Sequence, residues 1–156
     1  QARDAGITCP IMAGDTWDDI SIAQRTGDKA TEIYFSAFFD AADTSNEAGK
    51  AFVDGFTKWV AEDSARVENN GGVTDVISSV TPCGYDAYMA AVGAIEAAQS
   101  TEGVAIRDAL ATLEIPGLIT GDLKFDDNGD AIKNYAVIKT IKDGQIVYFS
   151  TFNGLE

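Results

Sequence analysis

The spacing of the apolar residues changes after Pro116-Gly117, and this change restricts the possible folds more than any other feature of the chain. Before that point, short runs rich in β-branched and aromatic residues alternate with segments of helical periodicity. After it, residues 118–152 alternate apolar and polar residues around Asn128-Gly129 and Asp143-Gly144, two dipeptides that favour type I′ hairpins. Strand and helix units followed by antiparallel hairpins predict an α/β layered fold with an antiparallel end.

The expected elements before Pro116 are two strands and four helices. Residues 7–13 should form a buried strand, and residues 31–39 a second strand. The helices should begin at the cap residue Asp18, at the Thr44-x-x-Glu47 capping box, at Pro82, and at Ser100 or Thr101. Residues 73–81 fit either a short helix or a strand. Residues 1–6 resemble the last turns of a helix ending at Gly6, which favours a fragment or a processed piece.

Composition limits the possible partners. The chain has 156 residues, enough for one domain, and a hydrophobic content of 46% that can fill a core. Its 25 acidic and 11 basic residues give a net charge of −14, which argues against binding to nucleic acid or to anionic lipid. No apolar run approaches the roughly 20 residues that a membrane span requires.

The sequence gives little indication of a metal site or a reactive thiol. There is no histidine, and Cys9 and Cys83 form no C-x-x-C pair, so a zinc site is not expected. Both cysteines are expected to be buried apolar thiols. A calcium loop starting at Asp126 would need Gly at its sixth position, where the chain has Ala131, and a closing Glu that is missing, so a hairpin turn is the favoured interpretation.

Asp15 is the candidate for a ligand-binding residue. It follows Gly14 at the carboxyl end of the first expected strand, where ligands bind in open α/β sheets, and Trp17 could supply an apolar wall beside it. A solvated strand-to-helix turn is the alternative at this stage.

Several stretches, taken in order, resemble one family. They are QARDAGITCPIMAGDTWDD, EIYFSAFFD, GYDAYMAAVGAIEAAQST, AIRDAL and GLITGDLKFDDNGDAIKNYAVIK. Together they resemble the type I periplasmic binding proteins, and most closely the branched-chain amino acid binding proteins of ABC importers. That family has two Rossmann-like lobes joined by hinge strands, and the ligand is buried between the lobes as they close. The chain resembles the C-terminal part, less than half of such a protein.

The resemblance implies a division of the chain between the two lobes. Residues 1–37 would belong to lobe two, residues 38–132 to lobe one, and residues 133–156 would return to lobe two. The segments near 38–40 and 131–134 would then be the hinges, which absorb the backbone rotation of closure.

The resemblance also implies a set of ligand-binding residues. Asp15 occupies the position of an acid that accepts hydrogen bonds from the α-ammonium of the ligand, and Gly14 would allow close approach of the backbone. Trp17 matches an aromatic residue that follows this acid in many relatives, and Thr16 lies between the two. Val80, six residues before the Asp of GYDAY, would touch the ligand side chain, although the preceding NNGGVTDVISSV departs from the family's usual spacing.

The function implied by the resemblance is that of an extracytoplasmic solute-binding protein, periplasmic or at the cell surface, without a cofactor. Its expected partners are an amino acid with a small or branched apolar side chain, the N-terminal part of the same fold, and an ABC permease. A ligand-binding sensor domain of a signalling receptor is the alternative. An acid-pair hydrolase is disfavoured, because no motif places two carboxylates together.

Overall fold

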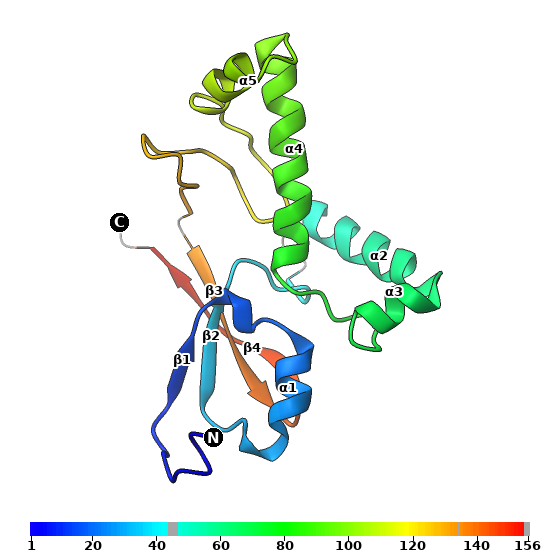
Figure 1. Ribbon diagram of the computed structural model, residues 1–156, viewed down its shortest axis with the longest axis vertical. Coiled ribbons are helices and arrows are strands. Elements are labelled where there is room, and N and C mark those ends of the chain that lie inside the picture. Colours follow the sequence, from blue (N-terminus) through cyan, green and yellow to red (C-terminus); the bar gives the residue numbers. More distant parts are fainter. Residues whose placement is uncertain (44–46, 134, 155–156) are drawn as a thin grey trace.

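A mixed four-stranded sheet lies at one end of the molecule, in the lower half of Figure 1. The computed structural model describes residues 1–43, 47–133 and 135–154. The strands run in the order β1 (Ile11–Ala13), β2 (Ile33–Ala37), β3 (Tyr135–Lys142) and β4 (Gln145–Asn153). β1 and β2 are parallel, whereas β2 with β3 and β3 with β4 are antiparallel. The predicted α/β class with an antiparallel end is therefore confirmed.

The two predicted hairpin dipeptides form different turns. Asp143 and Gly144 both have positive φ, 53° and 73°, which is the type I′ geometry expected between β3 and β4. Gly129 also has a positive φ of 87°, but Asn128 does not, so the type I′ prediction is wrong at this dipeptide. The carboxylate of Asp126 instead accepts hydrogen bonds from the backbone amides of Asn128, at 2.8 Å, and Asp130, at 2.9 Å. Side-chain bonds of this kind favour an Asx-type turn.

The first strand is shorter and more open than predicted. β1 has three residues, Ile7 lies outside it and is 46% exposed, and Met12 is 68% exposed. The predicted buried strand over residues 7–13 is therefore wrong. β2 alternates buried and half-buried residues along its length, because only one of its faces packs against the core.

The helices are α1 (Ile20–Thr26), α2 (Glu47–Ala61), α3 (Ser64–Asn69), α4 (Val80–Ala98) and α5 (Gly103–Leu110). Asp19, not Asp18, caps α1, because its carboxylate accepts a hydrogen bond from the amide of Ser21 at 2.7 Å. The helix α4 begins two residues before Pro82, and residues 73–79 form neither helix nor strand. Thr44 of the predicted capping box lies outside the described residues.

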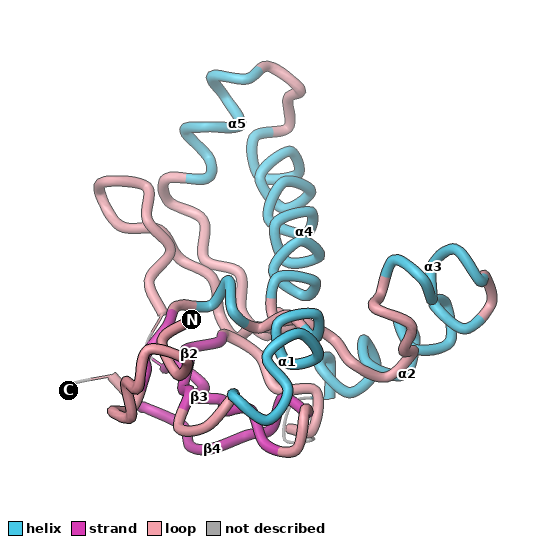
Figure 2. The backbone as a smooth tube through the Cα atoms, turned by 60° about the horizontal axis from the view of Figure 1, so that its bottom comes forward, coloured by secondary structure: helices cyan, strands magenta, loops and turns pink. Residues whose placement is uncertain are grey.

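The described residues form two units, one built on the sheet and one on the helices α2 to α5 (Figures 1 and 2). Each unit has a hydrophobic core cluster of its own. The sheet unit comprises residues 1–37 and 135–154, with α1 and the short turn η1 (Asp15–Trp17), and its cluster includes Ala23, Phe35 and Ile141. The helical unit comprises residues 38–43 and 47–132, and its cluster is built around Phe39, Ile77 and Ile119. The chain leaves the sheet unit after Ala37 and returns to it at Tyr135. That these two connections act as hinges stays a prediction, and Asn134 of the second predicted hinge lies outside the described residues.

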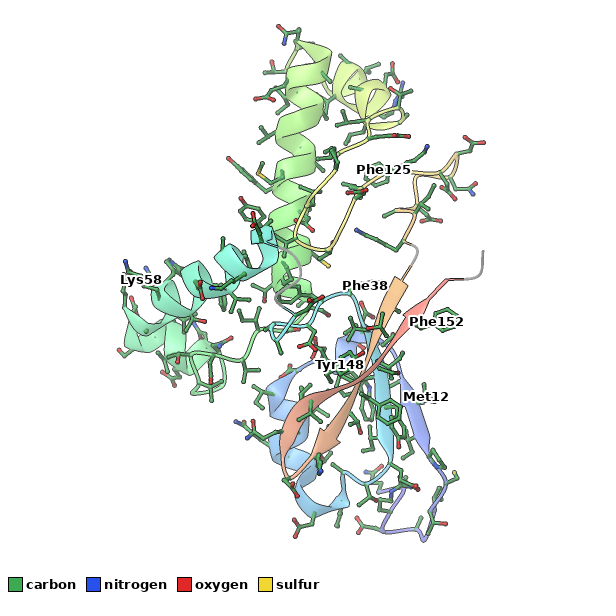
Figure 3. All side chains as sticks on the ribbon, turned by 180° about the vertical axis from the view of Figure 1, so that it is seen from behind. Met12, Phe38, Lys58, Phe125, Tyr148 and Phe152 are labelled. Atoms are coloured by element: carbon green, nitrogen blue, oxygen red, sulfur yellow. The ribbon has the colours of Figure 1, made fainter. Side chains whose placement is uncertain are left out.

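Large apolar side chains remain exposed on both units. On the sheet unit, Met12, Tyr148 and Phe152 lie on β1 and β4, the two edge strands (Figure 3). On the helical unit, exposed apolar side chains occur on α2, α4 and α5 and include Trp59, Tyr85, Tyr88, Ile95 and Val104. Among the described residues, no helix combines the length and apolar character needed to span a bilayer.

Candidate functional site

A cavity of about 450 Å³ lies where the two units meet. The sheet unit lines it with η1 and the first residues of α1, and the helical unit lines it with the end of α3 and the approach to α4. The lining residues are Asp15, Thr16, Asp19, Ile20, Ser21, Glu68, Asn69, Asn70, Gly71, Val76, Ser78 and Val80. The cavity therefore brings together three of the four predicted site residues, from positions up to 65 residues apart in the sequence.

The carboxylate of Asp15 is presented to this cavity by a tight turn. Gly14 is extended, and its carbonyl accepts a hydrogen bond from the amide of Trp17 at 3.1 Å, which starts η1 directly after β1. Asp15 is half-buried. Within the described part of the chain, its carboxylate has no hydrogen-bond partner, so both oxygens are available to accept from a ligand. A Cβ atom at Gly14 would meet no atom of the described residues within 4 Å, so these residues leave the space beside Gly14 open.

The other predicted site residues divide into two groups. Thr16 and Val80 line the cavity from opposite units, and Val80 is 55% exposed. Trp17 does not line the cavity but packs against the core cluster of the sheet unit. Its role in the structure described is to anchor η1 to the sheet, next to Asp15.

The cavity lining is negatively charged. Asp15, Asp19 and Glu68 contribute three carboxylates, and no Lys or Arg is among the lining residues. The carboxylate of Asp19 is already engaged in capping α1. Such a wall attracts a cationic group, and an anionic group bound here would need hydrogen-bond donors or positive charge from elsewhere.

Sequence reasoning missed a buried ion pair beside the cavity. Lys139 on β3 donates hydrogen bonds to Asp18 at 3.0 and 3.2 Å, and the amide of Ser79 donates to the same carboxylate at 2.8 Å. The side chains of Lys139 and Asp18 are only 6% and 2% exposed. A signal was available in the sequence, because Lys139 is in phase with the buried Val137 and Ile141 on β3. A lysine at a core-facing position requires a buried anion as its partner.

The two thiols are both free, but they do not share one environment. Cys9 is exposed, so the prediction that it is buried is wrong, and Cys83 on α4 is half-buried. Burial raises the pKa of the Cys83 thiol above its ordinary value, and the carboxylates of Asp86 and Asp15 add to this rise. The nearby ammonium of Lys133 acts in the opposite direction. The contribution of Asp15 places Cys83 within electrostatic range of the candidate site.

Other hollows in the molecule have simpler explanations. One hollow of about 670 Å³ lies between residues 114–124 and 132–133, and the ammonium of Lys133 beside it already donates to the backbone carbonyl and hydroxyl of Thr120. A second, of about 490 Å³, is an apolar surface of α2 and α4 that includes Phe52 and Trp59. Among the described residues, no group of three His, Cys, Asp or Glu side chains is arranged to hold a metal ion.

Comparison with known proteins gives a consistent result. The model of a family described as periplasmic binding protein matches residues 1–145. The leucine-binding protein LivK of Thermotoga maritima is 29% identical with a TM-score of 0.74, over 98% of this chain and 40% of its own length. The branched-chain amino acid transporter substrate-binding protein LivJ of Streptococcus pneumoniae, solved in complex with isoleucine, is 28% identical with a TM-score of 0.66, over 94% of this chain and 38% of its own.

A third structure agrees in fold. An ABC transporter substrate-binding protein of Desulfitobacterium hafniense, in complex with Leu, is 24% identical with a TM-score of 0.62 and is covered over 38% of its length. A search of curated protein sequences found no match. The chain thus spans about 40% of the length of the solved structures it resembles.

Proposed function

Because this chain belongs to the periplasmic binding protein family, we propose that it forms part of a closing amino-acid site in an extracytoplasmic solute-binding protein of an ABC importer. This is a family of binding proteins, so the expected mechanism is binding and closure and not catalysis. The sheet unit would belong to lobe two and the helical unit to lobe one. The two separate core clusters support this division, since each unit has a core of its own.

The observation that carries the proposal is the carboxylate of Asp15, which lines a cavity between the units and has no hydrogen-bond partner among the described residues. An α-ammonium group bound there would donate charge-assisted hydrogen bonds to this carboxylate, which contribute roughly 1.5–3 kcal/mol. The ligand carboxylate needs positive or N–H partners, and the cavity lining offers no basic side chain. We therefore assign the carboxylate end of the ligand to groups from the rest of the fold.

The ligand side chain is proposed to be apolar. Val80 and Ile20 reach the cavity from opposite units, and burial of a branched aliphatic side chain against them would contribute roughly 1.5–3 kcal/mol. An acidic side chain in the same place would face Glu68 and Asp19 without a compensating base. The relatives named for leucine and solved with isoleucine support the same class.

Closure follows from contacts that a ligand makes with both units. A ligand held by Asp15 on the sheet unit and by Val80 on the helical unit binds the closed arrangement better than the open one. It therefore shifts the population toward closure by the difference between the two affinities. The closed form is the species presented to the permease.

The test is the affinity for leucine of two matched variants in the assembled protein, meaning this chain together with the N-terminal part of the fold. Asp15→Asn removes the charge proposed to bind ammonium and should weaken binding about ten-fold or more. Asp19→Asn removes an equal charge from the same cavity, but asparagine still caps α1, so binding should change much less. Calorimetry that finds equal effects for the two variants would remove Asp15 from the ammonium site.

A further inference from the structure

The backbone amide of Ser79 connects the two walls of the cavity. Ser79 lies between Ser78 and Val80, which line the cavity from the helical unit. Its amide donates to the carboxylate of Asp18, which lies between the cavity residues Thr16 and Asp19 of the sheet unit. This one hydrogen bond, 2.8 Å long, therefore joins the strip that carries Asp15 to the strip that carries Val80.

The acceptor is held in place from within its own unit. Asp18 and Lys139 both belong to the sheet unit, so their ion pair does not depend on how the two units are arranged. Ser79 belongs to the helical unit, so its amide reaches Asp18 only when the units are together. The carboxylate is thus already oriented in either arrangement, and of the hydrogen bonds that it accepts from Lys139 and Ser79, the one from Ser79 depends on the arrangement of the units.

Because it is buried, this hydrogen bond contributes more free energy than one at the surface would. Asp18 is 3% exposed and Ser79 is fully buried, so no water replaces the bond while the units are together. A second contact accompanies it, because the side-chain amide of Gln24 on α1 donates to the carbonyl of Gly71 at 3.3 Å. A Cβ on Gly71 would lie 2.7 Å from a methyl carbon of Ile20, so α1 and the 70–71 corner approach as closely as glycine permits.

We propose that Asp18, oriented by Lys139, is a positioning residue for ligand binding, because its hydrogen bond to the Ser79 amide stabilises the closed arrangement of the two units. The inference rests on the proposed function, since it assigns a role to Asp18 in the same closing site. Asp18 need not touch the ligand. Any interaction made only in the closed arrangement lowers the apparent dissociation constant, because it reduces what the ligand must supply for closure.

The sharpest variant removes only the donor. Ser79 has φ of −60°, close to the value that proline imposes, and it is the cap residue of α4, where a missing N–H is tolerated. Ser79→Pro therefore deletes the hydrogen bond to Asp18 and leaves the Asp18–Lys139 pair in place. The matched control is Ser79→Ala, which keeps the amide and removes a buried hydroxyl that has no hydrogen-bond partner among the described residues.

Two measurements distinguish a positioning role of Asp18 from a general loss of folded structure. The first is the dissociation constant and rate constants for leucine in the assembled protein. Ser79→Pro should raise Kd roughly ten-fold or more, mainly through faster dissociation, while Ser79→Ala stays close to wild type. The second is the distance between spin labels at Lys142→Cys on the sheet unit and Glu96→Cys on the helical unit, both exposed positions, in a Cys9→Ser, Cys83→Ser background.

The spin-label distances also distinguish failure of the inference from failure of the proposed function. If wild type binds no amino acid, the proposed function fails, and the ligand-free distance distributions still decide the role of the bond. The inference predicts a larger open population in Ser79→Pro than in wild type or Ser79→Ala. Unchanged affinity together with unchanged distances would overturn it. If Ser79→Pro does not fold, the double variant Asp18→Asn, Lys139→Met takes its place. This variant weakens the acceptor without leaving a buried charge, and the same two measurements apply to it.

Discussion

The carboxylate of Asp18 lies 3.0 Å from the ammonium of Lys139, and both side chains are almost completely buried. The two residues are 121 positions apart in the sequence, so the pair fixes the entry to α1 against β3. Removing one partner of a buried pair leaves an uncompensated charge, which costs about 3–5 kcal/mol, whereas removing both charges together costs much less.

Lys139→Met should therefore lower the free energy of unfolding of the assembled protein by about 3–5 kcal/mol. The combination of Lys139→Met with Asp18→Asn should recover a large part of that loss, because the buried carboxylate is then neutral as well. Lys142→Met, on the same strand but at an exposed position, is the matched control and should be nearly neutral. Urea unfolding that shows similar losses for Lys139→Met and Lys142→Met would contradict the structural role of the pair.

Features that depend on neighbouring residues could be predicted from the sequence, whereas features that depend on residues far along the chain could not. The β3–β4 hairpin could be predicted because Asp143-Gly144 determines its turn locally. The family could be predicted because several motifs occur in the right order, and the match over residues 1–145 confirms it. The prediction of a buried strand over residues 7–13 failed because an apolar run does not show whether another element covers it. The exposed Met12 shows that one face of this strand is uncovered.

The cap of α1 was predicted at Asp18 but lies at Asp19, because reasoning from neighbouring residues does not include contacts with distant ones. Asp18 and Asp19 are both good cap residues, and the sequence does not distinguish them until Lys139 is recognised as a core-facing lysine that needs a partner. Within the candidate site, Asp15 was predicted from its place at a strand end and Val80 from the family resemblance, and the two residues share one cavity in the structure. That they contact a ligand stays a prediction.

The exposed apolar surface predicts that the isolated chain does not fold cooperatively. Trp59 and Tyr85 on the helical unit and Phe152 on an edge strand are all exposed, and patches of this kind require a partner. In differential scanning calorimetry, the monomeric chain alone should give no sharp transition. Addition of the N-terminal part of the fold should restore one, and a cooperative melt of the monomer by itself would show that these surfaces need no cover.

The negatively charged cavity predicts which amino acids stabilise the assembled protein. In a thermal-shift screen of the twenty amino acids, leucine, isoleucine or valine should raise Tm most, because each offers an ammonium to Asp15 and a branched side chain to Val80. Glutamate and aspartate should have little effect. Stabilisation by the acidic amino acids alone would place a basic residue from the rest of the fold against the ligand side chain and would refute the apolar assignment.

The raised pKa of Cys83 predicts slow alkylation that responds to a substitution in the candidate site. Only the thiolate reacts, so burial and the nearby carboxylates should make Cys83 react with iodoacetamide more slowly than the exposed Cys9 at mildly alkaline pH. The negative charge of Asp15 contributes to this rise, so Asp15→Asn should lower the pKa of Cys83 and move its rate profile toward lower pH. Asp28→Asn, at an exposed position outside the cavity lining and without a contribution to the raised pKa of Cys83, serves as the control and should leave the profile in place. Peptide mass spectrometry across a pH series measures both sites in one sample, and an identical Cys83 profile in wild type and Asp15→Asn would show that Asp15 and the thiol are not electrostatically coupled.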